Sequence, residues 1–156
     1  MTGTPSASPA TILVVDDHAI FREGVKLLLD REPQLRVVGE AGSPETALAL
    51  AATHQPNIIL LDLDLDGRDG LDIVESLQAT VPGARIIVLT GMRTPELQAR
   101  ALQLGARGFV LKEQSAELLV RAIRKVLEGE LWFDRETVGH AVTRMLKGPP
   151  RAPTPI

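Results

Sequence analysis

Short runs of apolar residues alternate along the chain with longer segments in which apolar residues recur every three or four positions. Runs of four to six mainly aliphatic residues, bounded by turn residues, are typical of strands buried in a parallel sheet. Such runs predict five strands, at residues 11–15, 35–40, 57–62, 85–90 and 108–111. Helical periodicity predicts five helices, over residues 18–31, 43–54, 70–80, 94–105 and 115–128.

The regular alternation of strand and helix, with short connections, determines the expected fold. It predicts an α/β domain whose parallel sheet is covered by helices on both faces through right-handed crossovers. The expected arrangement is a flavodoxin-like (βα)5 doubly wound parallel sheet with strand order 2-1-3-4-5. Ligands of such sheets bind beyond the carboxyl ends of the strands, at the switch between the first and the third strand. The functional residues are therefore expected at the strand ends.

The segment 57–70, NIILLDLDLDGRDG, places four aspartates directly after a predicted buried strand. The pattern D-x-D-x-D-G from Asp62 matches the first half of a calcium-binding EF-hand loop, but Ile73 stands where that loop needs a bidentate Glu. The letters LDLDG also resemble the nucleophile loop of haloacid dehalogenase-type phosphatases, with Asp64 as nucleophile and Asp66 as acid. In a third interpretation, Asp62 alone accepts a phosphoryl group. The alternative to all three is an acidic, solvent-exposed loop that has no catalytic or metal-binding role.

Polar residues at the other strand ends favour the third interpretation. Asp16 and Asp17 follow the first predicted strand, Thr90 ends the fourth, and Lys112 follows the fifth. Carboxylates suit Mg²⁺, a hard cation that takes oxygen ligands, and a Lys amine and a Thr hydroxyl suit phosphate oxygens. Each residue alone has an ordinary explanation as a helix cap, a strand end or a solvated charge. Together they predict a site for Mg²⁺-assisted phosphoryl transfer to Asp62.

Four motifs in this order resemble the receiver domain of two-component response regulators. They are VVDDH (14–18), LLDLDLDGRDG (60–70), VLTG (88–91) and GARGFVLKE (105–113). The resemblance covers residues 11–130. The segments FREGVKLLL and AIRKVLEGE are similar to the NarL/FixJ subfamily, whose members carry a C-terminal LuxR-type helix-turn-helix.

This resemblance implies a phosphoacceptor and a metal site. A sensor histidine kinase would transfer a phosphoryl group to Asp62. Mg²⁺ would be held by Asp17, Asp62 and the backbone carbonyl of Asp64, with Asp16 acting through water. Such a protein is not a conventional enzyme, because it catalyses only its own phosphorylation and dephosphorylation. A small Mg²⁺-dependent phosphatase using Asp64 and Asp66 and a receiver-like scaffold that is never phosphorylated are the alternatives.

The resemblance also implies a conformational switch. Thr90 and Lys112 would contact the phosphoryl group and move inward, and Phe109 occupies the position of the family's rotating aromatic residue. The fourth helix, fifth strand and fifth helix would then shift. That shift would change a homodimer surface or the contact with a DNA-binding domain that controls transcription.

The chain departs from the family pattern at several positions. Asp66 stands where Pro is common, and Gly91 replaces a common Ala. Asp64 and Met92 lie two positions beyond the acceptor and beyond the strand-end threonine, where residues of this family tune the lifetime of the phosphate. Asp64 and Met92 therefore predict an altered rate of dephosphorylation, since Asp64 could repel or orient the attacking water.

Composition adds limits on partners and location. The net charge of −3 argues against direct nucleic-acid binding by this chain, and the absence of cysteine excludes disulfides and thiolate metal sites. No apolar run approaches membrane-spanning length, and the N-terminus lacks a secretory signal, so a cytoplasmic location is expected.

The two ends of the chain are predicted to lie outside the receiver domain. Residues 1–10 are expected to be a disordered lead, residues 131–147 a possible linker helix and residues 148–156 a Pro-rich linker or tail. Nothing after Lys147 could form a helix-turn-helix. This favours a receiver cut from a longer regulator at its linker over a natural single domain.

Overall fold

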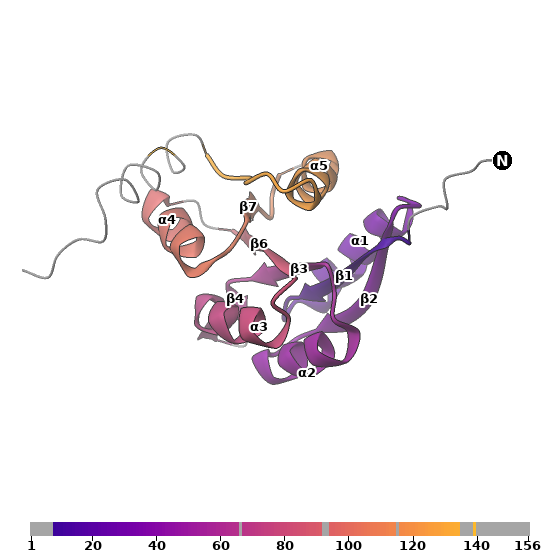
Figure 1. Cartoon of the computed structure of the whole chain (residues 1–156), viewed down its shortest axis with the longest axis horizontal. Helices are drawn as coiled ribbons and strands as arrows, with labels where there is room; N and C mark the ends of the chain where they lie inside the picture. The colour runs from indigo at the N-terminus through magenta and orange to yellow at the C-terminus, as the bar shows by residue number, and fades with distance from the viewer. Residues whose placement is uncertain (1–7, 66, 92–93, 115, 135–138, 140–156) are drawn as a thin grey trace, which may run out of the picture.

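A five-stranded parallel sheet forms the centre of the protein in the computed structural model, which describes residues 8–65, 67–91, 94–114, 116–134 and 139. The strands lie in the order β2-β1-β3-β6-β7 (Figure 1). Their bounds are β1 (Ala10–Val15), β2 (Leu35–Ala41), β3 (Ile58–Asp62), β6 (Arg85–Thr90) and β7 (Gly108–Leu111). The strand β3 is buried at every position, as its unbroken apolar run predicts.

The predicted strand order 2-1-3-4-5 needs a correction. Between β3 and β6 the chain forms an antiparallel pair of two-residue strands, β4 (Asp64–Leu65) and β5 (Arg68–Asp69). Numbered along the described chain, the sheet order is therefore 2-1-3-6-7. The sequence pattern missed this hairpin because two residues are too few to establish a period, and because Asp and Gly are depleted in strands.

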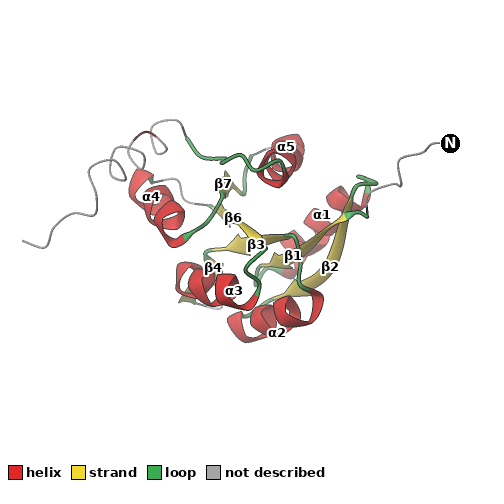
Figure 2. Cartoon of the chain, viewed as in Figure 1, coloured by secondary structure: helices red, strands yellow, loops and turns green. Residues whose placement is uncertain are grey.

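Helices cover both faces of the sheet (Figure 2). One face packs against α1 (Ala19–Asp30) and α5 (Ala116–Leu127), and the other packs against α2 (Pro44–His54), α3 (Val74–Thr80) and α4 (Pro95–Leu104). The predicted helix starts at 43 and 94 are confirmed, since Ser43 and Thr94 each accept a backbone N–H three residues later, at 3.2 Å. The predicted cap Ser115 lies outside the described residues.

Alternation along the strands separates the two cores. Leu13 and Ile59 contribute to the core beneath α2, α3 and α4, whereas Ile12 and Ile58 contribute to the core beneath α1 and α5. All four side chains have no exposed surface. Burying an aliphatic side chain of this size stabilises a protein by about 1.5–3 kcal/mol, so both faces of the sheet hold the strand ends in place.

The chain leaves the acidic hairpin through a tight turn. The helix predicted over residues 70–80 is interrupted, because Gly70–Ile73 forms a 3-10 helix, η1, before α3 begins at Val74. The Gly70 N–H donates to the carbonyl of Leu63 at 2.7 Å, which draws this turn against the end of β3. A Cβ on Gly70 would lie 2.5 Å from the Asp62 carbonyl oxygen, so only glycine fits there.

The chain returns to the sheet after α5. Gly129, with φ of +97°, turns it back, and Trp132 forms a parallel bridge to Gly108 of β7. The Phe109 N–H donates to the Trp132 carbonyl at 2.8 Å, and the Trp132 N–H donates to the Arg107 carbonyl at 2.9 Å. Trp132 therefore lies beside β7, at the outer edge of the sheet.

Parts of both predicted ends fall outside the described chain. These are residues 1–7 of the expected lead and, except for residue 139, residues 135–156 of the expected linker helix and tail. None of the helices in the described part is long and apolar enough to cross a membrane.

Candidate functional site: a carboxylate cluster at the strand ends

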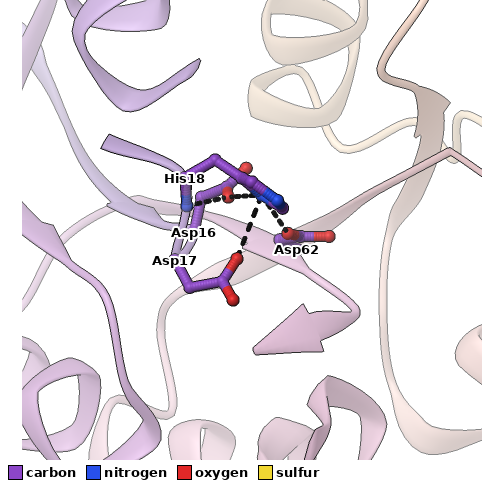
Figure 3. A group of neighbouring side chains, drawn as sticks. All are labelled: Asp16, Asp17, His18 and Asp62. Atoms are coloured by element: carbon purple, nitrogen blue, oxygen red, sulfur yellow. Dashed lines mark hydrogen bonds and ion pairs between the residues drawn. The ribbon is translucent and has the colours of Figure 1, made fainter. Parts of the chain in front are cut away.

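The carboxyl ends of β1 and β3 bring the predicted acidic residues together. Asp16 and Asp17 directly follow β1, and Asp62 is the last residue of β3. Because the strands are parallel neighbours, these ends meet at one edge of the sheet. Figure 3 shows the side chains of Asp16, Asp17, His18 and Asp62 grouped at this edge. One ligand atom from each of the four lies within 4.8 Å of those of the others.

Two of these carboxylates are buried and share one cation. Asp16 has no exposed surface and Asp62 is 2% exposed. The Lys112 amine, which follows β7, lies 2.8 Å from Asp16 Oδ2 and 2.8 Å from Asp62 Oδ2. An isolated buried charge is costly, and neighbouring carboxylates repel each other. Lys112 is therefore the counter-charge that allows both acids to occupy this edge.

The two buried acids differ in their proton affinity. Burial raises the pKa of Asp62 above its ordinary value, and the hydrogen bonds from Lys112 and from the Asp64 N–H offset this only in part. Burial also raises the pKa of Asp16, but hydrogen bonds from Lys112 and His18 outweigh it and hold that pKa below its ordinary value. The negative charge of Asp62 is thus the less stabilised of the two, which suits a nucleophile.

Lys112 keeps its charge in this environment. Burial lowers the pKa of the amine, but its hydrogen bonds to Asp16 and Asp62 outweigh burial and raise that pKa above the ordinary value. The backbone N–H of Lys112 donates to the Thr90 carbonyl at 2.9 Å, which fixes the backbone that carries the amine. The same amine lies 4.6 Å from the centre of the Phe21 ring in α1, a further favourable contact for a cation.

The other predicted site residues lie around this centre. Asp17 and Asp64 are exposed, and the Asp64 N–H donates to Asp62 Oδ1 at 3.1 Å. Thr90 is buried at the end of β6. Phe109 is buried in β7, on the opposite side of the sheet from α1 and α5. Its ring lies 6.4 Å from that of Phe133, between centroids. The predicted residues Asp66 and Met92 lie outside the described residues.

His18 belongs to the site, although the sequence pattern assigned it no role. Its ring Nδ1 lies 2.9 Å from Asp16 Oδ1 and 3.0 Å from Asp17 Oδ1. The hydrogen bond with Asp16 raises the pKa of His18. The available signal was its position directly after two aspartates at a strand end. That signal is weak, because the direction of a ring at a helix start depends on the tertiary structure.

Comparisons with known proteins agree on one family. Residues 12–124 match the family of the response regulator receiver domain. The nitrate/nitrite response regulator protein NarL of Escherichia coli K12 is 39% identical over 123 residues, which are 79% of this chain and 57% of NarL. The response regulator protein VraR of Staphylococcus aureus is 33% identical over 136 residues, which are 87% of this chain and 65% of VraR. The chain thus spans less than two thirds of the length of these relatives.

Solved structures show the same similarity. A two-component response regulator of the LuxR family from an Aurantimonas species has a TM-score of 0.78 and 31% identity, covering 89% of this chain and 99% of that chain. The signal receiver domain of the putative response regulator NarL from Mycobacterium tuberculosis has a TM-score of 0.74 and 32% identity, covering 79% of this chain and 99% of that chain.

Proposed function

The chain belongs to the family of response regulator receiver domains, and on this premise we propose that it is a signalling switch controlled by phosphorylation of Asp62. One observation carries the choice of acceptor. Asp62 ends the central strand β3, is 2% exposed, and has both of its oxygens engaged, one by Lys112 and one by the Asp64 N–H. Asp69 also ends a strand and pairs with a cation, Arg100, but that pair is 3.8 Å apart and both side chains are exposed, whereas the Asp62–Lys112 pair is 2.8 Å apart and Asp62 is buried.

The reaction transfers a phosphoryl group from a phosphohistidine of a sensor histidine kinase. A carboxylate oxygen of Asp62 attacks phosphorus, the P–N bond breaks, and its electron pair returns to the histidine nitrogen. Lys112 offsets the negative charge that the phosphoryl group adds next to Asp16. The backbone N–H of Asp64 orients the attacking carboxylate.

The donor set fits Mg²⁺, because the cluster consists mainly of carboxylate oxygens, the ligands that hard cations prefer. Asp17, Asp62 and the backbone carbonyl of Asp64 would hold the ion, and Asp16 would act through water. When bound, Mg²⁺ neutralises charge on the phosphoryl oxygens. Asp64 and Met92 would set the lifetime of the phosphate.

The response to phosphorylation is a shift between two populations. Thr90 and Lys112 move toward the phosphoryl group, Phe109 rotates, and the face formed by α4, β7 and α5 changes. This face would control a homodimer surface or a DNA-binding domain of a longer, cytoplasmic protein. NarL and VraR are named as response regulators, and a related protein, DegU of Brevibacillus brevis, as a transcriptional regulatory protein.

Residues 131–134, which follow α5, contact Phe109 and could therefore respond to a movement of its ring. Phe133 packs on Phe109, and the Phe109 N–H is bound by the carbonyl of Trp132. Asp134 Oδ2 accepts a hydrogen bond at 2.9 Å from Gln98 of α4, whose side chain is 2% exposed. A rotation of the Phe109 ring would change its contact with Phe133, and through Phe133 it would reach the neighbouring Trp132 and Asp134.

Replacing Phe133 with Ala is expected to uncouple this segment from the site. The variant should lose about 1–2 kcal/mol of stability, less than a fully buried Phe→Ala change, since Phe133 is half-buried. It should take up phosphoryl groups as the wild type does. Hydrogen exchange of residues 129–134 should change on phosphorylation in the wild type and not in the variant. The exposed neighbour Leu131→Ala is the control and should respond as the wild type does. An unaltered response in Phe133→Ala would contradict this coupling.

Intact mass after incubation with acetyl phosphate tests the proposed function. We expect one added phosphoryl group in the presence of Mg²⁺ and none after removal of Mg²⁺ by a chelator. Sustained turnover of a phosphomonoester would instead support a phosphatase using Asp64 and Asp66. A folded protein that binds Mg²⁺ but forms no adduct would support an unphosphorylated scaffold.

A further inference from the structure

The imidazole of His18 lies among the carboxylates, and the phosphoryl transfer proposed above does not use it (Figure 3). Its Nδ1 lies 3.0 Å from Asp17 Oδ1 and 3.8 Å from Asp62 Oδ2. These two acids are the carboxylates proposed to hold the metal. We infer that His18 determines the metal specificity of the site, by adding a nitrogen ligand that favours transition-metal ions such as Ni²⁺ and Co²⁺ over Mg²⁺.

The backbone holds His18 in this position. Its N–H donates to Asp16 Oδ1 at 2.8 Å, and Asp16 is fully buried, so the residue is tied to a fixed point at the end of β1. His18 also occupies the position immediately before α1, with extended backbone angles. The ring Nδ1 lies 2.9 Å from the same Asp16 oxygen, so the ring is oriented toward the carboxylates as well. An oriented ligand atom needs little reorganisation to bind a metal, which favours a specific contribution to affinity.

The spacing of the atoms suits adjacent metal ligands. Two neighbouring ligands, each about 2.1 Å from an octahedral ion, are separated by about 3.0 Å. The distance between His18 Nδ1 and Asp17 Oδ1 is 3.0 Å. A cation already lies beside His18 Nδ1, because the Lys112 amine is 3.4 Å from this nitrogen and 2.8 Å from Asp62 Oδ2. The surroundings of His18 Nδ1 therefore favour positive charge.

Ligand chemistry then sets the direction of the preference. Imidazole nitrogen suits Zn²⁺, Cu²⁺, Fe²⁺ and Ni²⁺, whereas carboxylates, carbonyls and water suit Mg²⁺. A site made of carboxylates alone discriminates less between these transition-metal ions and Mg²⁺. The added nitrogen should therefore strengthen Ni²⁺ and Co²⁺ binding selectively and leave Mg²⁺ binding to the oxygen ligands.

Metal titration of His18→Asn tests the inference without requiring activity. Asn keeps a favourable residue before α1 and removes the ring nitrogen. By calorimetry, we expect the affinity for Ni²⁺ to fall about tenfold or more, because the loss of residues around a metal typically lowers its affinity by about that factor. The affinity for Mg²⁺ should stay within about twofold of the wild type, because its oxygen ligands are kept. The visible absorption spectrum of bound Co²⁺ should shift in the variant. His54→Asn is the matched control, because His54 is an exposed histidine at the end of α2, and it should change neither affinity.

Two results would overturn this role of His18. One is an equal loss of Ni²⁺ and Mg²⁺ affinity, which would indicate that His18 only positions the acids. The other is an unchanged Ni²⁺ affinity together with an unchanged Co²⁺ spectrum. The inference rests on the proposed metal site, but the experiments distinguish the failure of one from the failure of the other. A wild type that binds neither Ni²⁺ nor Mg²⁺ would contradict the metal site itself. Mg²⁺-dependent phosphorylation together with an unchanged Ni²⁺ affinity in His18→Asn would contradict only the role of His18.

Discussion

Asp62→Asn is expected to abolish phosphoryl incorporation, because the amide has no carboxylate oxygen to attack phosphorus. Intact mass with acetyl phosphate and Mg²⁺ should show one adduct on the wild type and none on the variant. Asp64→Asn is the matched control, since Asp64 lies two residues away on β4, is exposed, and contacts Asp62 through its backbone N–H, which the substitution keeps. This control should keep the adduct, and the rate at which it loses the phosphate would test the role of Asp64 in its lifetime.

A thermal melt shows whether Asp62→Asn folds. The pKa of Asp62 is raised in the folded state, so ionised Asp62 destabilises the fold at pH values above its unfolded pKa. The neutral Asn should therefore raise the melting temperature by a few degrees at pH 7, and the gain should disappear below about pH 4. An adduct that persists in folded Asp62→Asn but is lost in Asp64→Asn would mean that Asp64 is the acceptor.

Lys112→Met is expected to cause a large loss of stability at neutral pH. The change leaves the buried carboxylates of Asp16 and Asp62 without the amine that lies 2.8 Å from each. Removing one partner of a buried ion pair costs about 3–5 kcal/mol. We expect about 3 kcal/mol, because the Lys112 side chain is 20% exposed and solvent screens part of the interaction. Urea unfolding at pH 7 measures the difference.

The pH dependence distinguishes this charge effect from a loss of packing. In the wild type, the lowered pKa of Asp16 contributes stability above its unfolded pKa, and this is lost as the pH falls. Without Lys112, burial raises the pKa of both acids, so the variant loses stability as the pH rises through their unfolded values. The stability gap should widen from about pH 4 to pH 7. A gap that is constant over this range would contradict the electrostatic explanation.

A matched lysine variant and a Mg²⁺ titration test whether the lost stability of Lys112→Met comes from the buried carboxylates. Lys125→Met removes a lysine of α5 that pairs only with the exposed Glu128 and Glu130, within the described contacts, and should have a small effect. Mg²⁺ should stabilise Lys112→Met more than the wild type, because the ion supplies positive charge to carboxylates that have lost their amine.

The sequence by itself predicted the five-stranded sheet and the side chains of Asp16, Asp17, Asp62 and Lys112 that lie together at one edge of it. The apolar run that ends at Asp62 is short and bounded by turn residues, which favours a strand buried on both faces over a helix, and β3 is such a strand. Parallel strands bring their carboxyl ends to one edge, so the acids after β1 and the lysine after β7 were expected to lie near Asp62. Helix starts at Ser43 and Thr94 were equally local, because each cap is satisfied within three residues.

The tertiary structure alone decided the features that depend on contacts between distant segments. The β4–β5 hairpin and the 3-10 turn at Gly70 depend on close approach to the end of β3, which no local period encodes. The return of Trp132 to the edge of β7 joins residues separated by a whole helix. The place of His18 depends on the burial of Asp16 and on the path of α1. Sequence periodicity reports which residues are buried, whereas the direction of a side chain and the contacts between segments are set only when the elements pack.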